Sequence, residues 1–431
     1  MNEYYWIQYE LSNGSLLDNI KLAGKLSQLC LICKGGKMLC GKLSCPIIAK
    51  AKFMIKSSSL VLSERVEGST PPGAFVGRIG YPKVYIGPML PPYIGNTEIL
   101  DTPELWIGKS IKEIVEYRLS LIRGKTRMHV EDALKGNRLL DLIQELSMSV
   151  SSVNSEAVFN KRPVGVVNLS EETPPFGPSS QLKSFKTSSI SIDRRIEKAY
   201  YDRDMKASEA IVQLYEQGVL ISRIQRAFSV GMLGIGNRRK LVPTRWSITA
   251  VDDIISLWLI KKIKQYDSLD DYEVYIFRNL DNLFLAIFMP EKWCFEWIEA
   301  WFPGTVWNFR GKNPAIIGDY ESYAGRSNYA KVGGCYYSAR LAVTEKLREM
   351  KKQAKVLVLR EIHPGYILPI GVWNVRESVR NALKRKPKKF DNLQSALNFA
   401  FKFLTVPFDK WIENSVILKE AFLQRKITDF R

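Results

Sequence analysis

The sequence predicts an α+β fold, within the wider class of mixed α/β proteins, built from more than one domain. At 431 residues the chain exceeds the roughly 250–300 residues at which a single hydrophobic core stops growing, so two or three domains are expected. Hydrophobic residues make up 46% of the chain and aromatic residues 11%, which is ample for packed interiors. Segments with helical spacing are interspersed with short apolar segments typical of strands, and this mixture indicates the fold class.

In the N-terminal half the expected elements are short. Residues 75–88 alternate small, aromatic and β-branched side chains between glycines and prolines, which predicts short strands broken by turns. Residues 109–123 and 132–146 have the spacing of helices. Residues 147–159 are polar and rich in serine, and they predict a loop.

Longer periodic segments follow. An apolar stripe along residues 204–229 predicts one helix. A second helix is expected over residues 252–266, with the carboxylate of Asp252 or Asp253 capping its start and lysines near its end.

The last third of the chain contributes strands as well as helices. Residues 273–277 and 283–289 predict a β-hairpin around 279–282. Residues 338–353 predict a helix, and residues 356–359 an apolar strand. These elements suggest four regions: an N-terminal zinc-binding module (1–56), two parts of a larger body (57–200 and 201–415), and a C-terminal helix with a flexible peptide (416–431).

The charge of the chain points to an anionic partner. Lys and Arg number 63 against 44 Asp and Glu, a formal net charge of +19. Such a surplus attracts polyanions, of which DNA is the leading candidate and RNA is not excluded. A membrane surface or simple solubility would also account for the charge, but no apolar run approaches the roughly 18 residues that span a bilayer. Without a signal peptide at the N-terminus we expect a cytoplasmic protein; its oligomeric state is left open.

Four cysteines form a cluster near the N-terminus. Cys30, Cys33, Cys40 and Cys45 are interspersed with glycines, and two short loops of this kind can place four thiolates at the corners of a tetrahedron around zinc. Four thiolates leave no open position, so the zinc would be structural rather than catalytic. The alternative is four reduced cysteines that pack as small hydrophobic side chains.

Two basic segments are candidates for contacts to nucleic acid. In the first, Arg238, Arg239 and Lys240 could bind phosphates, and Arg245 beside Trp246 could stack on a base. In the alternative, Trp246 belongs to the core. The second segment is a basic loop at 384–389 that includes Lys384, Arg385 and Lys386; such a run is commonly only solvated.

One acidic segment is a candidate for catalysis. Asp319 and Glu321 stand two residues apart, near Arg326. With Glu345 and Glu361 as further ligands, the two carboxylates could bind magnesium or manganese for phosphodiester hydrolysis. Arg245 and Arg326 are further candidate residues of this site. Salt bridges use the same residue types. Convergence of the acids in one cleft would favour catalysis, whereas an arginine bonded to each in the core would favour a structural role.

The C-terminal residues suggest a docking peptide. Gln424, Ile427 and Phe430 form the pattern Q-x-x-I-x-x-F, which in one turn of tight helix places the two apolar side chains on one face. This resembles the peptide by which replication and repair proteins bind the sliding clamp PCNA, although Arg431 occupies the place of its second aromatic residue. The alternative is an amphipathic last turn that docks on its own domain.

Five longer segments resemble one family. They read FVGRIGYPKVYIGP (75–88), PPFGPSSQL (174–182), LVPTRWSITAVDD (241–253), GDYESYAGRSNYA (318–330) and LPIGVWNVRESVR (368–380). In this order, and with the C-terminal peptide, they resemble the archaeal Nre family of DNA repair proteins, its NreA type in particular. The resemblance implies a cytoplasmic archaeal protein that takes part in DNA damage repair and binds PCNA through Gln424, Ile427 and Phe430. It implies no settled enzymatic activity.

We therefore expect a DNA repair factor that binds DNA through a basic surface and is recruited to PCNA by its C-terminal peptide. The alternative is a metal-dependent nuclease that uses Asp319, Glu321 and the neighbouring basic residues.

Overall fold

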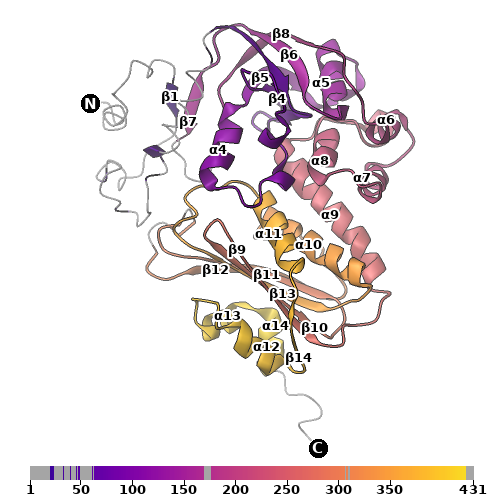
Figure 1. The fold of residues 1–431 in the computed structure, drawn as a ribbon. Coiled ribbons are helices and arrows are strands. Elements are labelled where there is room, and N and C mark those ends of the chain that lie inside the picture. Colours follow the sequence, from indigo (N-terminus) through magenta and orange to yellow (C-terminus); the bar gives the residue numbers. More distant parts are fainter. Residues whose placement is uncertain are drawn as a thin grey trace, which may run out of the picture. The chain divides into compact units, whose positions relative to one another are not determined.

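The computed structural model describes residues 20–23, 33, 39, 45, 47–48, 61, 63–168, 176–305, 307–308 and 311–423. These residues divide into two compact units (Figure 1). The first extends through Ile255 and includes Leu368–Ile370, and the second comprises Ser256–Ile367 and the residues from Gly371 onward. Most of the predicted zinc-binding module and the whole of the predicted docking peptide lie outside the described residues.

The first unit is built on a six-stranded sheet. Its strand order is β2-β6-β8-β5-β4-β3, and all neighbours are antiparallel except β5 and β8, which are parallel. The strands are β2 (Arg65–Thr70), β3 (Ala74–Val76), β4 (Lys83–Leu90), β5 (Ile122–His129), β6 (Val153–Phe159) and β8 (Ser179–Thr187). A separate parallel pair joins β1 (Ile20–Ala23) to β7 (Gly165–Asn168).

The two faces of this sheet carry different side chains. Alternate residues, among them Leu90, Ile122, Ala157 and Phe159, are buried in a common core that also includes Leu146 of helix α5 (Arg138–Met148). Because side chains alternate along a strand, the residues between them point to the opposite face. On β5 that opposite face carries cations instead of apolar side chains.

Helices and short 3-10 turns make up the rest of the first unit. The α-helices are α4 (Ile111–Ser120), α5 (Arg138–Met148), α6 (Arg194–Tyr201), α7 (Ala207–Glu216), α8 (Ile221–Ser229) and the start of α9 (Thr244–Ile263). The 3-10 turns are η2 (Glu98–Leu100), η3 (Pro103–Leu105), η4 (Val130–Leu134) and η5 (Gly236–Arg238).

Two sequence predictions in this unit are wrong for a local reason. Residues 204–229 form two helices, because Gly218 adopts a φ of 74° and ends α7. Residues 147–159 contain strand β6 as well as a loop. The serines did not prevent the strand, since Ser155 is buried and donates its hydroxyl to the carbonyl of Val153.

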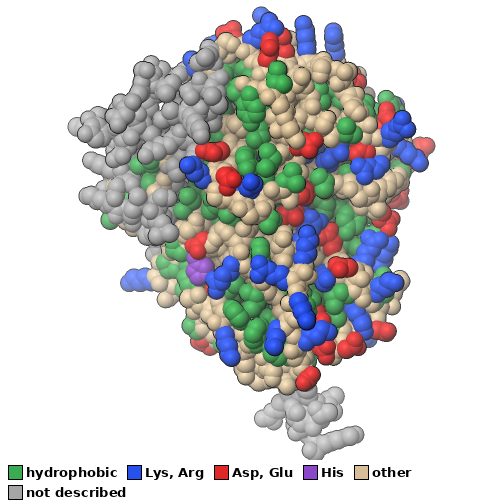
Figure 2. All heavy atoms as spheres, in the orientation of Figure 1, with side chains coloured by type: hydrophobic (Ala, Val, Ile, Leu, Met, Phe, Trp, Pro, Cys, Tyr) green, Lys and Arg blue, Asp and Glu red, His purple; other side chains and the backbone are tan. Residues whose placement is uncertain are grey.

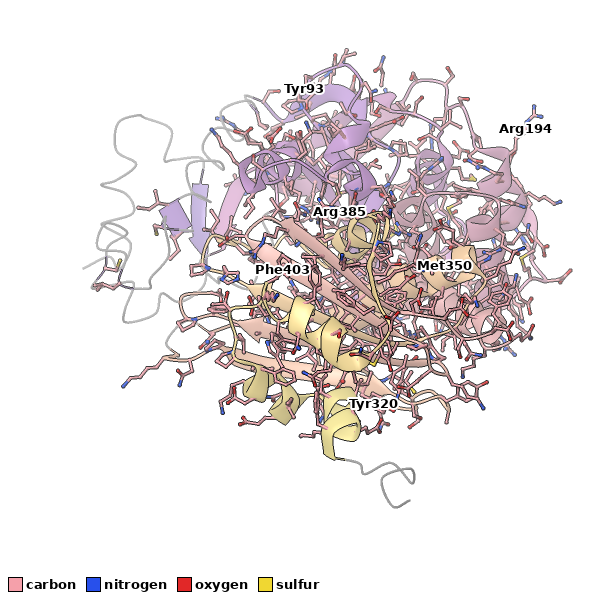
Figure 3. The ribbon with its side chains drawn as sticks, turned by 60° about the horizontal axis from the view of Figure 1, so that its bottom comes forward. Tyr93, Arg194, Tyr320, Met350, Arg385 and Phe403 are labelled. Carbon is pink, nitrogen blue, oxygen red and sulfur yellow. The ribbon has the colours of Figure 1, made fainter. Side chains whose placement is uncertain are left out.

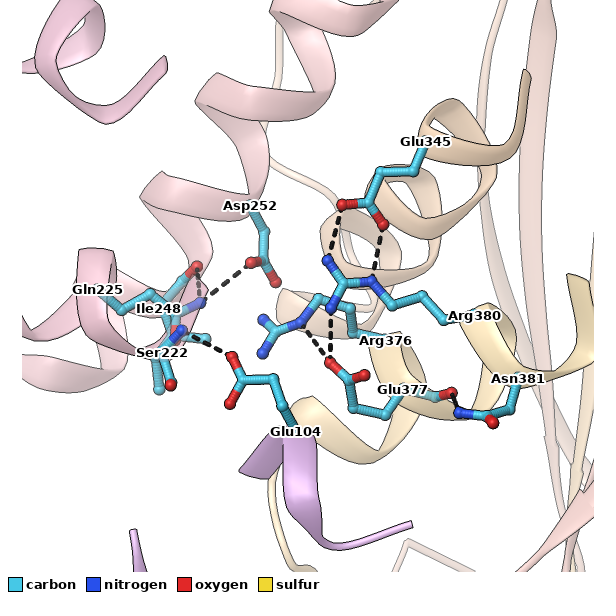
Figure 4. A network of polar contacts seen from close by, with 10 residues as sticks. All are labelled: Glu104, Ser222, Gln225, Ile248, Asp252, Glu345, Arg376, Glu377, Arg380 and Asn381. Carbon is cyan, nitrogen blue, oxygen red and sulfur yellow. Dashed lines mark hydrogen bonds and ion pairs between the residues drawn. The ribbon is translucent and has the colours of Figure 1, made fainter. Parts of the chain in front are cut away.

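The start of α9 is also different from the prediction. The helix begins at Thr244, directly after Pro243, so Asp252 lies inside it and caps nothing. The Asp252 carboxylate is buried and accepts a hydrogen bond of 3.0 Å from Gln225 Nε2 of α8 (Figure 4). Trp246 is 46% exposed, so it is not a core residue.

The second unit is a three-layer sandwich. Its sheet has the order β12-β11-β13-β10-β9-β14, with β11 and β13 parallel and the other neighbours antiparallel. The strands are β9 (Tyr272–Asn279), β10 (Asn282–Met289), β11 (Cys294–Trp301), β12 (Ala315–Glu321), β13 (Lys355–Ile362) and β14 (Lys388–Phe390). The central strands are buried almost throughout, as is expected of a sheet covered on both faces.

Helices cover both faces of this sheet (Figure 1). One core joins Val356 and Val358 of β13 to α10 (Gly334–Met350), α11 (Trp373–Leu383) and the end of α9. The other joins Leu357 and Leu359 to three short helices, α12 (Leu393–Ala400), α13 (Phe408–Asn414) and α14 (Val416–Leu423). The alternation along β13 thus divides the unit into two cores.

The predictions for the second unit are largely confirmed. The expected hairpin is β9–β10, and its two turn residues, Leu280 and Asp281, have φ angles of 52° and 56°, the conformation that matches the twist of a two-residue hairpin. The expected helix and strand are α10 and β13. The basic segment at 384–389 is only partly a loop, because its end forms the edge strand β14.

Candidate functional site

The acidic segment of the second unit folds into a closed loop. Asp319 Oδ1 accepts a hydrogen bond of 3.1 Å from Arg326 Nη2, and Oδ2 accepts one from the backbone N–H of Lys331. The Arg326 guanidinium lies over the ring of Tyr336, 4.7 Å from its centroid. Asp319 therefore holds the middle of the segment that follows β12, at Arg326, and its end, at Lys331.

Glu321 is held in the interior by a buried arginine. Its Oε2 accepts a hydrogen bond of 2.7 Å from Arg340 Nη1, and both side chains are 1% exposed. Its Oε1 accepts one of 3.2 Å from Trp293 Nε1, while Arg340 Nε donates to Ser256 Oγ at 3.1 Å. Each of the two candidate catalytic carboxylates is thus bonded to an arginine, the arrangement that favours a structural role.

The other two acids considered for catalysis are also engaged. Both oxygens of Glu345 accept hydrogen bonds of 2.7 Å from Arg380, which donates a further one of 2.9 Å to Glu377 (Figure 4). Glu361 is buried and accepts from the backbone N–H groups of Thr405 and Val406 at 2.8 and 2.7 Å. Within the described ranges, no group of three or more His, Cys, Asp or Glu residues could hold a metal ion.

The basic segment at 238–240 offers two of its three cations to solvent. Arg238 and Lys240 are exposed, and Lys240 lies 3.1 Å from the carboxylate of Glu131. Arg239 is buried at 6% exposure, and its guanidinium donates to three backbone carbonyls at 2.7 Å, those of Tyr200, Asp202 and Gly234. Arg239 therefore holds η5 in place instead of facing a phosphate.

Arg245 and Trp246 stand exposed on the first turn of α9. The Trp246 ring lies 5.2 Å from that of Tyr81, which is also exposed. The start of α9 is fixed to β3 by a hydrogen bond of 2.9 Å from the Val76 N–H to Thr244 Oγ1. The first and third family-like segments thus meet at an exposed aromatic pair with an arginine beside it.

A second group of cations lies on the face of the first sheet opposite its apolar core. Arg123, Lys125 and Arg127 alternate along β5, and Tyr85 of β4 lies opposite Arg127. The Arg123 guanidinium stands 5.5 Å from the ring centroid of Phe75 and 4.5 Å from that of Phe176. We call these six residues the β5 basic–aromatic face.

This face is not among the sites predicted from the sequence, because the predicted helix over residues 109–123 extends into the start of β5. The sequence IRGKTRMH at 122–129 does carry a signal, since its cations recur with a period of two, as on one face of a strand. The contribution of Phe75 and Phe176 could not be found in this way, because the fold alone brings these distant residues to Arg123.

The basic loop of the second unit is exposed. Lys384, Arg385 and Lys386 face solvent after α11, and the Arg385 guanidinium lies 4.7 Å from the Phe277 ring centroid. Arg385 can be followed in Figure 3. On the side of the molecule in Figure 2, Lys and Arg side chains are interspersed with Asp and Glu instead of forming one continuous patch.

The structure describes two of the four predicted zinc ligands and no residue of the predicted docking motif. Cys33 is buried and Cys45 partly buried, while Cys30 and Cys40 lie outside the described residues. Gln424, Ile427 and Phe430 also lie outside them.

The helix that precedes the peptide is firmly anchored. The Glu296 carboxylate of β11 accepts hydrogen bonds from Ser415 Oγ (2.6 Å) and the backbone N–H groups of Val416 (2.7 Å) and Ile417 (3.0 Å). It thereby caps the start of α14. Burial raises the pKa of Glu296, against the effect of these hydrogen bonds.

Among the helices that the structure describes, none is long and apolar enough to cross a membrane.

Comparison with known proteins accounts for most of the chain. The family description "Archaeal Nre, N-terminal" matches residues 39–308, and "Archaeal Nre, C-terminal" matches residues 321–430. No solved structure matches the chain.

Three curated relatives align over most of their length. "DNA repair protein NreB" of Archaeoglobus fulgidus is 42% identical over 402 residues, 93% of this chain and 99% of its own. "DNA repair protein NreA" of the same organism is 39% identical over 87% of this chain and 93% of its own. "DNA repair protein NreA" of Haloferax volcanii is 32% identical over 88% and 92%. Both names occur among them, so they show the family without separating its two types: the chain belongs to the archaeal Nre family.

Proposed function

We propose that the protein is a DNA repair factor that binds DNA through basic surfaces and is recruited to the sliding clamp PCNA by its C-terminal peptide. The observation that carries the repair role is the alignment with relatives named DNA repair proteins over nearly their whole length. The net charge of +19 supports an anionic partner. Two groups support DNA as that partner: the β5 basic–aromatic face, whose Arg127 and Tyr85 are exposed, and the exposed residues Arg245 and Trp246.

DNA binding is tested by fluorescence anisotropy with labelled duplex and single-stranded DNA at about 50 mM and about 200 mM salt. We expect binding that weakens steeply with salt, because phosphate contacts release counterions. Unlabelled RNA and DNA of matched length are added as competitors. Absence of binding at the lower salt, or stronger competition by RNA, would contradict the proposal.

Recruitment to PCNA rests on the pattern Gln424, Ile427 and Phe430 and on the anchoring of α14 immediately before it. A peptide tethered to an anchored helix on the same DNA acts at a high effective concentration, so a modest affinity suffices. Without a second aromatic residue at position 431 we expect that affinity to be weak.

Calorimetry of the full chain with PCNA tests this contact. The double variant Ile427→Ala, Phe430→Ala should lose at least about tenfold in affinity, because it removes the two apolar anchors. The matched control Thr428→Ala, Asp429→Ala alters positions between the anchors and should bind as the wild type does. Wild-type affinity for PCNA in the Ile427→Ala, Phe430→Ala variant would show that the peptide is not part of the interface.

We also propose that Cys30, Cys33, Cys40 and Cys45 hold one structural zinc ion. Their C-x2-C start and intervening glycines support this. Metal analysis of the purified chain should give about one zinc per chain, and the variant Cys30→Ser, Cys33→Ser should lose it. Full metal content in that variant would contradict the assignment.

A further inference from the structure

Two of the family-like segments converge on strand β5 although they are far apart in the sequence. The first segment contributes Phe75 and the second Phe176, and the Arg123 guanidinium lies close to both rings. The backbone N–H of Arg123 also donates to the carbonyl of Pro178 in the second segment, at 2.9 Å. The guanidinium plane is therefore held from more than one side.

Each of these segments also supplies a glycine at a close backbone approach. A Cβ atom at Gly87 would stand 1.7 Å from the carbonyl oxygen of Gly124, and one at Gly177 would stand 2.1 Å from that of Leu121. No side chain fits at such distances. The two glycines let β4 and the 176–178 segment close in on β5 at the level of Arg123 and Lys125.

The cations in this setting have no described acid beside them. Arg123 and Lys125 share one face of β5, and the positive charge of Arg123 acts on Lys125 to lower its pKa. Among the described residues no carboxylate forms an ion pair with either side chain. Arg123 makes one long hydrogen bond, 3.4 Å from Nη2 to the Gly177 carbonyl, and its solvent-inaccessible Nε has no partner.

Two partly buried cations such as Arg123 and Lys125 destabilise the fold unless a bound anion neutralises them. Burial lowers the pKa of Arg123 to about 10, and burial together with the charge of Arg123 lowers the pKa of Lys125 to about 8. Two like charges removed from water repel each other and lose hydration. An anion between them would reverse both effects.

A phosphate group fits the donors that surround this position. A guanidinium offers a planar pair of N–H donors and an ammonium a point charge, the two groups that proteins use for phosphate. The neighbouring strand β8 places Ser179 beside Arg123 and Gln181 beside Lys125 in the parallel register. Both are uncharged and can donate hydrogen bonds.

We propose that Arg123 and Lys125 form a phosphate-binding site on the β5 basic–aromatic face, and that the phosphate belongs to the backbone of bound DNA. The assignment to DNA rests on the proposed function, whereas the phosphate site rests on β5 alone. Arg127 and Tyr85 extend the same face along the strand. DNA lying across the sheet would thus meet one more cation, Arg127, and an aromatic ring beyond the site.

The test compares single variants of the full chain in phosphate-free buffer. Lys125→Gln should bind DNA about tenfold more weakly than the wild type, because it removes one charge-assisted contact. Lys125→Arg should retain most of the affinity. Lys112→Gln, which removes the charge of an exposed lysine on α4, is the matched control and should bind like the wild type.

A melting experiment separates a binding role from a structural one. Without any anion, Lys125→Gln should melt at the wild-type temperature or above it, because it relieves the repulsion from Arg123. Inorganic phosphate or a nucleoside monophosphate should raise the melting temperature of the wild type more than that of Lys125→Gln. A marked loss of stability in Lys125→Gln without anions would contradict the site.

The remaining outcomes distinguish the claims. If small phosphates stabilise only the wild type but both proteins bind DNA equally, the phosphate site stands and its assignment to DNA is overturned. If the wild type binds no DNA at all, the proposed function fails while the melting experiment still decides the site. If neither DNA binding nor stabilisation by phosphate depends on Lys125, the inference is wrong.

Discussion

Strand β5 and the interior of the second unit hold buried cations in different ways. In the second unit Arg340 pairs with Glu321 at 2.7 Å and Arg380 with Glu345 at 2.7 Å. Elsewhere in the first unit Arg226 is paired likewise, with Asp101 at 2.8 Å. On β5 Arg123 lies instead against aromatic rings and a backbone carbonyl, and no described carboxylate pairs with it or with Lys125. A paired charge stabilises a fold only together with its partner. An unpaired buried charge is unfavourable without a ligand, and this difference points to a ligand on β5.

The largest effect is expected from breaking the most buried pair. Glu321→Gln leaves the charge of Arg340 uncompensated in the interior and should lower the free energy of unfolding by about 3–5 kcal/mol. Chemical denaturation measures this change. The double variant Glu321→Leu, Arg340→Met should recover most of the loss, because no charge then remains buried; no recovery would show that the pair's environment, not its charge balance, sets the stability.

A smaller loss is expected at the partly buried pair of Arg380 and Glu345. Glu345→Ala removes a bidentate partner from Arg380, whose side chain is 18% exposed, and should cost about 1–3 kcal/mol. Arg380 keeps its contact with Glu377, so the loss should stay below that of Glu321→Gln. An equal or larger loss would contradict the ranking by burial.

The charge of Lys125, unlike the paired charges above, should destabilise the fold, and this effect should appear in a defined pH range. Its pKa in the folded state is about 8, below the roughly 10.4 of an unfolded chain. Between these values the unfolded chain binds more protons, so the stability of the wild type should rise with pH from about 8 to about 10.5. The full shift would correspond to about 3 kcal/mol, and screening by solvent at this partly exposed side chain reduces the expected rise to about 1 kcal/mol. Denaturation of wild type and Lys125→Gln across this range checks it; parallel curves would place Lys125 in an ordinary solvated setting.

The smallest effect is expected at an exposed pair. Lys410 and Glu413 lie 2.9 Å apart with side chains 51% and 56% exposed. Glu413→Ala should leave the free energy of unfolding nearly unchanged, because water and salt screen the pair. Thermal denaturation provides the comparison, and a loss as large as that of Glu345→Ala would show that distance alone ranks these pairs.

The sequence was sufficient where local patterns decide the structure. The β9–β10 hairpin follows from two apolar segments around a short polar turn, and α10 from its helical spacing. It was insufficient where partners come from afar. The sequence around Asp252 is typical of a helix cap, but α9 starts at Thr244. Gln225 of α8 donates a hydrogen bond to the Asp252 carboxylate instead.

The same limit applies to the candidate site. Asp319 and Glu321 have the spacing of a metal site, and only the fold shows that Arg326 and Arg340 occupy them. Arg239 stands in a basic run, yet its guanidinium donates hydrogen bonds to backbone carbonyls. For each of these residues, the role depends on which partner the fold supplies and not on its neighbours in sequence.

The affinity for DNA as a function of pH tests the contact between Lys125 and the phosphate backbone most directly. DNA phosphates keep their charge throughout, so any loss must come from the protein. Between about pH 7 and pH 9 the affinity of the wild type should fall by about tenfold as free Lys125 loses its proton, whereas Lys125→Arg should stay level. Identical pH profiles for the two proteins would contradict the account.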